Sequence, residues 1–190
     1  MRMSIPVVVL SLIFACSGQE NRGESRHKKN ELNVVRVVPA SSTEILRAIG
    51  KLDAEAVVVN VWATHCPPCR EEFPDLLQLR RNFGPLGMKL LLVAVDPETS
   101  TAKVQEFLAS QNIDFPTYIR SDHDLKFVGT FDPRWTGALP ATWIYDSRGT
   151  LRHFWEGRRP YRFMEDKVTE VMNGGIAREG IFAVPNNKLR

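Results

Sequence analysis

Apolar residues in this chain gather in short runs, and the segments between those runs have helical periodicity. Continuous apolar runs at residues 57–62 and 88–96 are typical of strands covered on both faces. Residues 71–79 between them predict a helix. This stretch therefore predicts a β-α-β unit, with parallel strands and a right-handed crossover.

Shorter segments predict further elements on both sides of this unit. Ser41 and Glu44 form a capping-box motif, which predicts a helix that ends at Gly50. Asp146 to Gly149 predicts the turn of an antiparallel hairpin. The remaining expected elements are strands at residues 34–38, 115–119, 141–145 and 150–155, and helices at residues 101–111, 124–131 and 161–172, the last ended by Gly174 and Gly175. The pattern predicts an α/β fold in which helices flank a central mixed β-sheet.

The first 33 residues differ from the rest of the chain. Arg2 and the apolar residues 5–15 have the pattern of an export signal, and this run is shorter than the roughly 20 residues that span a bilayer. We expect residues 1–15 to be a signal peptide. Residues 17–33 are almost entirely polar and predict a flexible tether. One domain is then expected at residues 34–174, followed by a tail at 175–190.

Cys16 ends a short segment, residues 13–16, that resembles a bacterial lipobox. That resemblance implies cleavage before Cys16 and attachment of lipid to it, which would anchor a lipoprotein to a membrane outside the cytoplasm. Two alternatives stay open. The leader is an ordinary signal peptide in which Cys16 is incidental, or it is an uncleaved anchor.

The charge pattern gives no indication of a nucleic-acid partner. The net charge is +3, the basic residues are dispersed, and no nucleic-acid motif is present. We expect Arg158, Arg159 and Arg162 to form a solvated face.

Cys66 and Cys69 form a CxxC motif directly after the apolar run. This spacing predicts a redox pair at a strand-to-helix turn, where the helix N-terminus stabilises a thiolate and makes Cys66 the nucleophile. Pro67 and Pro68 lack N–H groups, so the N–H of Cys69 is expected to be the nearest backbone donor to the Cys66 sulfur. Fewer donors favour a less acidic thiol and a reductant.

A zinc site and a static disulfide are the other uses of two closely spaced cysteines. A zinc site needs two further soft ligands, and the remaining cysteine is the distant Cys16. A static disulfide across so small a loop constrains the unfolded chain little. We therefore expect no metal and no cofactor.

Three segments together resemble the TlpA/ResA-type extracytoplasmic thioredoxins: residues 59–63, 66–74 and 139–149. The resemblance extends over about residues 34–172. It implies a thioredoxin-like fold with a central β-α insertion, for which residues 101–131 leave room.

The resemblance also implies roles around the cysteines. Pro140 corresponds to a cis-proline that faces the disulfide, and Leu139 and Ala141 flank a groove for the substrate, although strand packing explains them equally well. Trp62, His65, Pro67 and Pro68 are the other residues expected to line this groove.

Glu72 lies three residues after Cys69, on the same helical face. In the family, the glutamate at this position is credited with exchanging a proton with the second, resolving thiol. Asn60 stands where thioredoxin has a buried aspartate, and an amide cannot act as a base. The alternative for Glu72 is a solvated side chain.

His65 departs from the family, which often has tryptophan before the first cysteine. A protonated His65 would lower the pKa of Cys66, whereas an exposed imidazole would have no role. Together with the thiols, His65 also raises the alternative of a Cu(I)-binding module.

These observations predict a membrane-tethered thiol-disulfide oxidoreductase of the periplasm or cell surface. Its expected substrates are disulfide-bearing exported proteins, for example apocytochrome c, and the family resemblance implies re-reduction by a membrane thiol transporter of the CcdA or DsbD type. We expect a monomer. A disulfide oxidant or isomerase is the main alternative.

Overall fold

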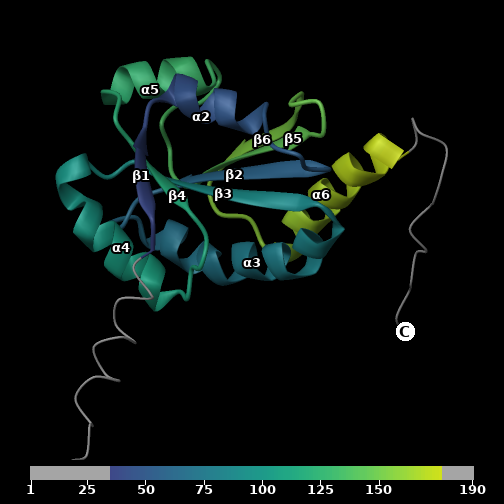
Figure 1. The fold of residues 1–190 in the computed structure, drawn as a ribbon, viewed down its shortest axis with the longest axis horizontal. Helices are drawn as coiled ribbons and strands as arrows, with labels where there is room; N and C mark the ends of the chain where they lie inside the picture. Colours follow the sequence, from purple (N-terminus) through teal and green to yellow (C-terminus); the bar gives the residue numbers. More distant parts are fainter. Residues whose placement is uncertain (1–34, 177–190) are drawn as a thin grey trace, which may run out of the picture. The chain divides into compact units, whose positions relative to one another are not determined.

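A six-stranded mixed β-sheet forms the centre of the protein in the computed structural model, which describes residues 35–176 (Figure 1). The strands are β1 (Val37–Ala40), β2 (Ala56–Trp62), β3 (Met88–Ala94), β4 (Thr117–Arg120), β5 (Ala141–Asp146) and β6 (Leu151–Glu156). Their order is β1-β4-β3-β2-β5-β6. The first four strands in this order pair in parallel, β5 pairs antiparallel with β2, and β6 pairs antiparallel with β5. The expected fold class is confirmed.

Five helices cover the two faces of this sheet within residues 35–176 (Figure 1). They are α2 (Ser42–Ile49), α3 (Pro67–Phe83), α4 (Thr101–Ser110), α5 (Asp124–Phe131) and α6 (Tyr161–Ile176), with 3₁₀ turns at Gly84–Leu86 and Glu98–Ser100. Apolar side chains of α3, α4 and α6 share one core cluster with the sheet, whereas α2 and α5 belong to the cluster on the other face.

Strand β2 is the central support of the active end. All of its residues are buried, as the continuous apolar run predicts. It pairs with β3 on one side and with β5 on the other, and its carboxyl end leads directly toward α3. The start of α3 is therefore attached to a strand that is paired on both of its edges.

Local signals in the sequence formed the expected structures. Ser41 and Glu44 make both hydrogen bonds of the capping box at the start of α2. Gly149 closes the hairpin turn with a φ of 72°, a conformation that favours glycine, and its N–H donates to the Asp146 carbonyl.

Residues 101–131, where we expected room for a β-α insertion, lie between β3 and the hairpin. They contain α4, β4 and α5, and β4 enters the sheet between β1 and β3. This arrangement makes β1 an edge strand.

Several predicted boundaries were wrong, and three of them have a clear cause. β1 begins at Val37 rather than residue 34, because its pairing follows β4 from Val37 onward. β4 begins at Thr117 rather than residue 115, because Pro116 has no N–H to donate to a ladder. α6 continues through the two glycines to Ile176, since glycine weakens a helix by only about 1 kcal/mol.

The predicted signal peptide, Cys16, the tether at 17–33 and the tail from residue 177 lie outside the described residues. In the described part of the chain, no helix has both the length and the hydropathy that crossing a bilayer requires.

Asp132 organises the segment that leads to Pro140. This buried carboxylate follows α5 and accepts hydrogen bonds from the backbone and guanidinium of Arg134 and from the indole of Trp143, the last at 2.9 Å. These bonds, above all those from the Arg134 side chain, lower the pKa of Asp132 to about 2 despite its burial. The ionised carboxylate therefore stabilises the folded state.

Asp132→Asn should lower the free energy of unfolding by about 2 kcal/mol at neutral pH. A carboxyl whose pKa is depressed on folding stabilises the protein above its unfolded pKa and loses that effect as pH falls toward the folded pKa. The difference between wild type and D132N should therefore shrink to about 1 kcal/mol at about pH 3. Urea unfolding at the two pH values measures it, with D53N, at an exposed carboxylate, as control. A difference that does not change with pH would contradict the stabilising role of the ionised group.

Candidate active site

Cys66 is the N-cap residue of α3, and it forms a disulfide with Cys69. The turn is closed by a hydrogen bond from the Cys66 N–H to the Ala63 carbonyl. Pro67 and Pro68 occupy the first helical positions. The N–H of Cys69 lies 3.3 Å from the Cys66 sulfur, which confirms the predicted donor.

The two cysteines differ in exposure. Cys66 retains 8% of its surface and Cys69 only 1%. Pro67 and Pro68 beside them are exposed. A sulfur atom of another protein can therefore approach Cys66 far more readily than Cys69.

Pro140 lies at the same end of the sheet as the disulfide. The Leu139–Pro140 peptide bond is cis, the isomer that the family resemblance implies. Because Ala141 pairs with Val61, Pro140 lies next to the end of β2 that leads to Cys66. Its carbonyl accepts a hydrogen bond from Gly157 at 2.7 Å.

A groove of about 570 Å³ is lined in part by the residues that precede Cys66 and Pro140 in the sequence. His65, which precedes Cys66, and Leu139, which precedes Pro140, line one end of it. Most of its other walls come from α5 and the segment that follows, including Trp135 and Leu125. Leu125 is 90% exposed, so the groove presents apolar surface to solvent.

Two residues that we expected to line the substrate groove do not reach the surface. Trp62 is fully buried, and its ring packs against Phe73 and Phe107 with centroid distances of 4.8 and 5.0 Å. Ala141 is also fully buried, because β5 lies between β2 and β6. Of the groove residues predicted from the sequence, His65 and the half-buried Leu139 line this groove, whereas Pro67 and Pro68 are exposed but do not line it.

Glu72 is fully buried rather than solvated. One carboxylate oxygen accepts a hydrogen bond from the Asn60 side-chain amide, and the other accepts the backbone N–H of Arg159, both at 3.0 Å. The same amide nitrogen donates to Thr142 at 3.0 Å. Glu72 thus joins α3 to β2, to β5 and to the segment before α6.

Burial raises the pKa of Glu72, and this effect outweighs the hydrogen bonds from Arg159 and Asn60 that lower it. Glu71, its neighbour, is exposed and pairs with Arg158 at 2.9 Å. The side chains of Arg158 and Arg159 are exposed, as expected of a solvated face. Arg158 also forms this ion pair, and Arg159 donates its backbone N–H to Glu72.

Sequence reasoning missed the role of Asp96. This buried carboxylate follows β3 and accepts hydrogen bonds from the backbone N–H of Thr64, at 3.0 Å, and from its hydroxyl. One of its oxygens lies 3.7 Å from Nδ1 of His65, whose side chain is 76% exposed. The sequence did contain a signal for this contact. Asp96 follows the carboxyl end of β3, which is parallel to β2, so it lies at the same edge of the sheet as the residues that follow β2.

Metal ligands do not gather in the described part of the chain. Nowhere in residues 35–176 do three or more His, Cys, Asp or Glu side chains form a group that could hold a metal ion.

Comparisons with known proteins agree with this geometry. The model of the AhpC/TSA family matches residues 26–154. The chain is 29% identical over 100 residues to the thiol-disulfide oxidoreductase ResA of Bacillus cereus, which covers 53% of this chain and about half, 54%, of that protein. It is 28% identical over 156 residues to ResA of Halalkalibacterium halodurans, covering 80% and 82% of the two chains.

A solved structure is also similar in fold. The thiol:disulfide interchange protein of Chlorobium tepidum superposes with a TM-score of 0.53 at 22% identity, over 66% of this chain and 83% of that one. The resemblance to ResA-type proteins and the thioredoxin-like fold are thereby confirmed. The chain belongs to the AhpC/TSA family.

Proposed function

We propose that this protein is an extracytoplasmic thiol-disulfide oxidoreductase that reduces disulfides in other proteins through Cys66 and Cys69. The observation that carries the proposal is the pair itself: a disulfide at the N-terminus of α3, in which Cys66 is the more exposed cysteine, at the same end of the sheet as the cis-proline Pro140. The relatives named as thiol-disulfide oxidoreductases support it.

The proposed reaction begins with the reduced enzyme. The Cys66 thiolate attacks a substrate disulfide, forms a mixed disulfide, and releases one substrate sulfur as a thiolate that takes up a proton. Cys69 then loses its proton, attacks the Cys66 sulfur and releases the second substrate thiolate. Two electrons pass to the substrate, and the enzyme is left with the Cys66–Cys69 disulfide.

Glu72 is proposed to accept the proton of Cys69. It lies one helical turn further along α3, and both groups are buried, so solvent is a poor competitor for this proton. The raised pKa of Glu72 brings it closer to that of a thiol, which favours transfer.

The direction of reduction is supported by the first turn of α3. Pro67 and Pro68 remove two backbone donors, and the Cys69 N–H is the donor recorded at the Cys66 sulfur. A thiolate with fewer donors is less stabilised, and a less stable thiolate favours a reducing pair. An oxidant or isomerase is the alternative that a measured reduction potential would reveal.

The setting of the reaction is proposed from the sequence of the first 33 residues. They support export, a lipid on Cys16 and a polar tether to a membrane surface. Disulfide-bearing exported proteins, apocytochrome c among them, would then be substrates of the monomer, and a membrane thiol transporter of the CcdA or DsbD type would restore its thiols.

Substitution of the two cysteines should separate their roles. Cys66→Ser should abolish insulin reduction, because the nucleophile is lost. Cys69→Ser should accumulate mixed disulfides, because nothing resolves them. Non-reducing electrophoresis of the trapped species and an insulin turbidity assay measure the two outcomes. Trapping by C66S rather than C69S would reverse the assignment.

Glu72→Gln should slow insulin reduction about tenfold or more at neutral pH, since it removes the proposed proton acceptor. Wild-type turnover should rise with pH as Glu72 ionises, and the variant should lack this rise. The matched control is Glu71→Gln at the neighbouring exposed carboxylate, for which turnover and its pH profile should stay unchanged. An unchanged pH profile in E72Q would remove Glu72 from the mechanism.

The stability of the same variants tests the raised pKa by itself. A carboxyl whose pKa is raised on folding destabilises the protein increasingly above its unfolded pKa of about 4. Relative to wild type, E72Q should therefore gain stability as the pH rises above about 4, as urea unfolding of the oxidised proteins measures. E71Q should show no such trend. A pH-independent difference for E72Q would contradict the effect of burial.

A further inference from the structure

Strand β3 has an open edge. It pairs with β2 along seven residues, from Met88 to Ala94, but with β4 at only two, Val93 and Ala94. On the β4 side, the first five residues of β3 therefore have no strand beside them within residues 35–176.

The sequence explains why β4 stops. Pro116 immediately precedes β4, and it stands two residues before Tyr118, which pairs with β3. Alternate residues of a strand direct their N–H and C=O groups to the same edge, so residue 116 would be the next to donate to β3. Proline has no N–H, and the ladder ends.

Backbone groups of β3 face this opening. The Val95 N–H donates to Trp62 of β2, so the even-numbered residues before it direct their groups to the other edge. Leu90 thus presents both its N–H and its C=O there. Among residues 35–176, no backbone partner is recorded for Leu90 on this edge.

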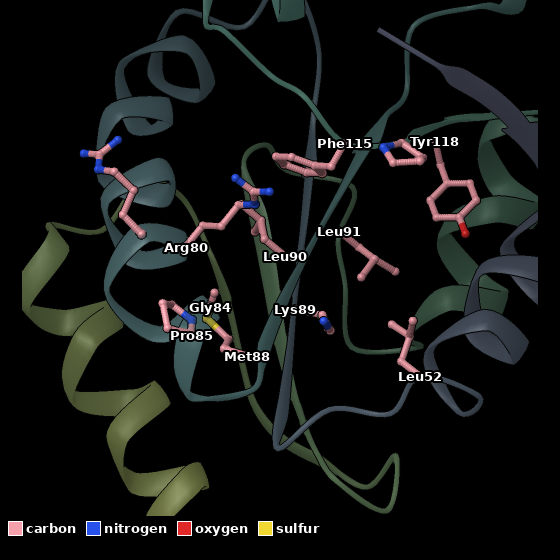
Figure 2. Close-up of a pocket in the computed structure, with 12 residues that line it drawn as sticks. Leu52, Arg80, Gly84, Pro85, Met88, Lys89, Leu90, Leu91, Phe115 and Tyr118 are labelled. Atoms are coloured by element: carbon pink, nitrogen blue, oxygen red, sulfur yellow. The ribbon is translucent and has the colours of Figure 1, made fainter.

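The opening is a cavity of about 640 Å³ with mainly apolar walls (Figure 2). Leu90 and Phe115 belong to the core cluster on the α3 side of the sheet, whereas Leu91 and Tyr118 belong to the cluster on the α2 side. Figure 2 shows these residues around the gap beside β3. An added strand would place its side chains alternately against these two groups.

The charged residues that line the cavity are all positive. Arg80 pairs with Asp114 at 3.2 Å and stacks over Phe115. Arg81 and Lys89 are exposed and also line the cavity, and neither forms an ion pair with another residue of the described range. Among the residues that line the cavity, the charge left without an ion pair inside the described range is therefore positive.

The cavity and the disulfide lie at opposite ends of the parallel strands. Ala56 pairs with Met88 at the cavity end, and Trp62 pairs with Ala94 at the end that leads to Cys66. A segment bound in the cavity would leave the redox end open.

We propose that the open edge of β3 binds an extended segment of a partner protein, which adds to the sheet as a strand and carries acidic side chains toward Arg81 and Lys89. The backbone of Leu90 supplies hydrogen bonds, and the two apolar groups hold alternate side chains. This docking function is separate from disulfide reduction.

Charge argues against two other occupants. A second copy of the chain would bring the same cations to the same edge. The chain's own segments at 17–34 and 177–190 each contain more Lys and Arg than Asp and Glu. An acidic segment of another protein is complementary to the site.

The test uses the full chain labelled with ¹⁵N and a synthetic peptide of about seven residues, which alternates valine and threonine and carries two glutamates. NMR titration should shift the Leu90 and Leu91 amides. A counterpart with lysines should bind about fivefold or more weakly, and a peptide N-methylated on its donor edge should not bind.

Charge reversal provides the matched control. K89E and R81E should each weaken the acidic peptide about fivefold, whereas K103E, at an exposed lysine of α4 that does not line the cavity, should not. Insulin reduction should be unchanged in all three, which keeps this test independent of the redox function. Equal binding of all the peptides, equal weakening by K103E, or shifts of the Leu90 amide that follow protein concentration alone would overturn the proposal.

Discussion

The buried carboxyl group of Glu72 connects four segments at the end of the sheet that carries the disulfide: α3, β2, β5 and the residues before α6. It sits on the helix that begins at Cys66, and its hydrogen bonds reach the Asn60 side chain on β2 and the Arg159 backbone before α6. Asn60 in turn bonds Thr142, two residues beyond Pro140. A buried carboxyl must keep its partners, because each lost hydrogen bond leaves an unsatisfied group at high cost. The positions of the disulfide and of Pro140 therefore depend on one another through this network.

Prolines shape both ends of the sheet by removing hydrogen-bond donors. Pro67 and Pro68 remove donors from the first turn of α3 and leave the Cys69 N–H as the recorded partner of the Cys66 sulfur. Pro116 ends the ladder between β3 and β4 and opens the cavity at the other end. The missing N–H of proline thus reduces the hydrogen bonding of the Cys66 sulfur at one end of the sheet and leaves an edge of β3 unpaired at the other. Neither consequence requires a strained backbone.

Local signals in the sequence predicted most of the fold, and long-range contacts account for what they missed. The capping box at Ser41 and the turn at Gly149 depend on neighbours in the sequence, so they were correctly predicted. The insertion of β4 between β1 and β3 depends on pairing across the whole domain. The inward side chain of Trp62 and the contact of Arg159 with Glu72 likewise involve distant partners. Spacing along α3 placed Glu72 near Cys69 but could not show that it was buried.

Burial also orders the steps of the proposed reaction. Cys66 is the sulfur that retains exposure, so the encounter with a substrate must begin there. Cys69 and Glu72 are both closed to solvent, so the proton that Cys69 gives up has a nearby buried acceptor rather than bulk water. Burial disfavours negative charge on the Glu72 carboxyl and raises its pKa, so a proton received from Cys69 is held better there than on an exposed glutamate. In this mechanism, the low dielectric around Glu72 couples proton movement to the redox state of the cysteines.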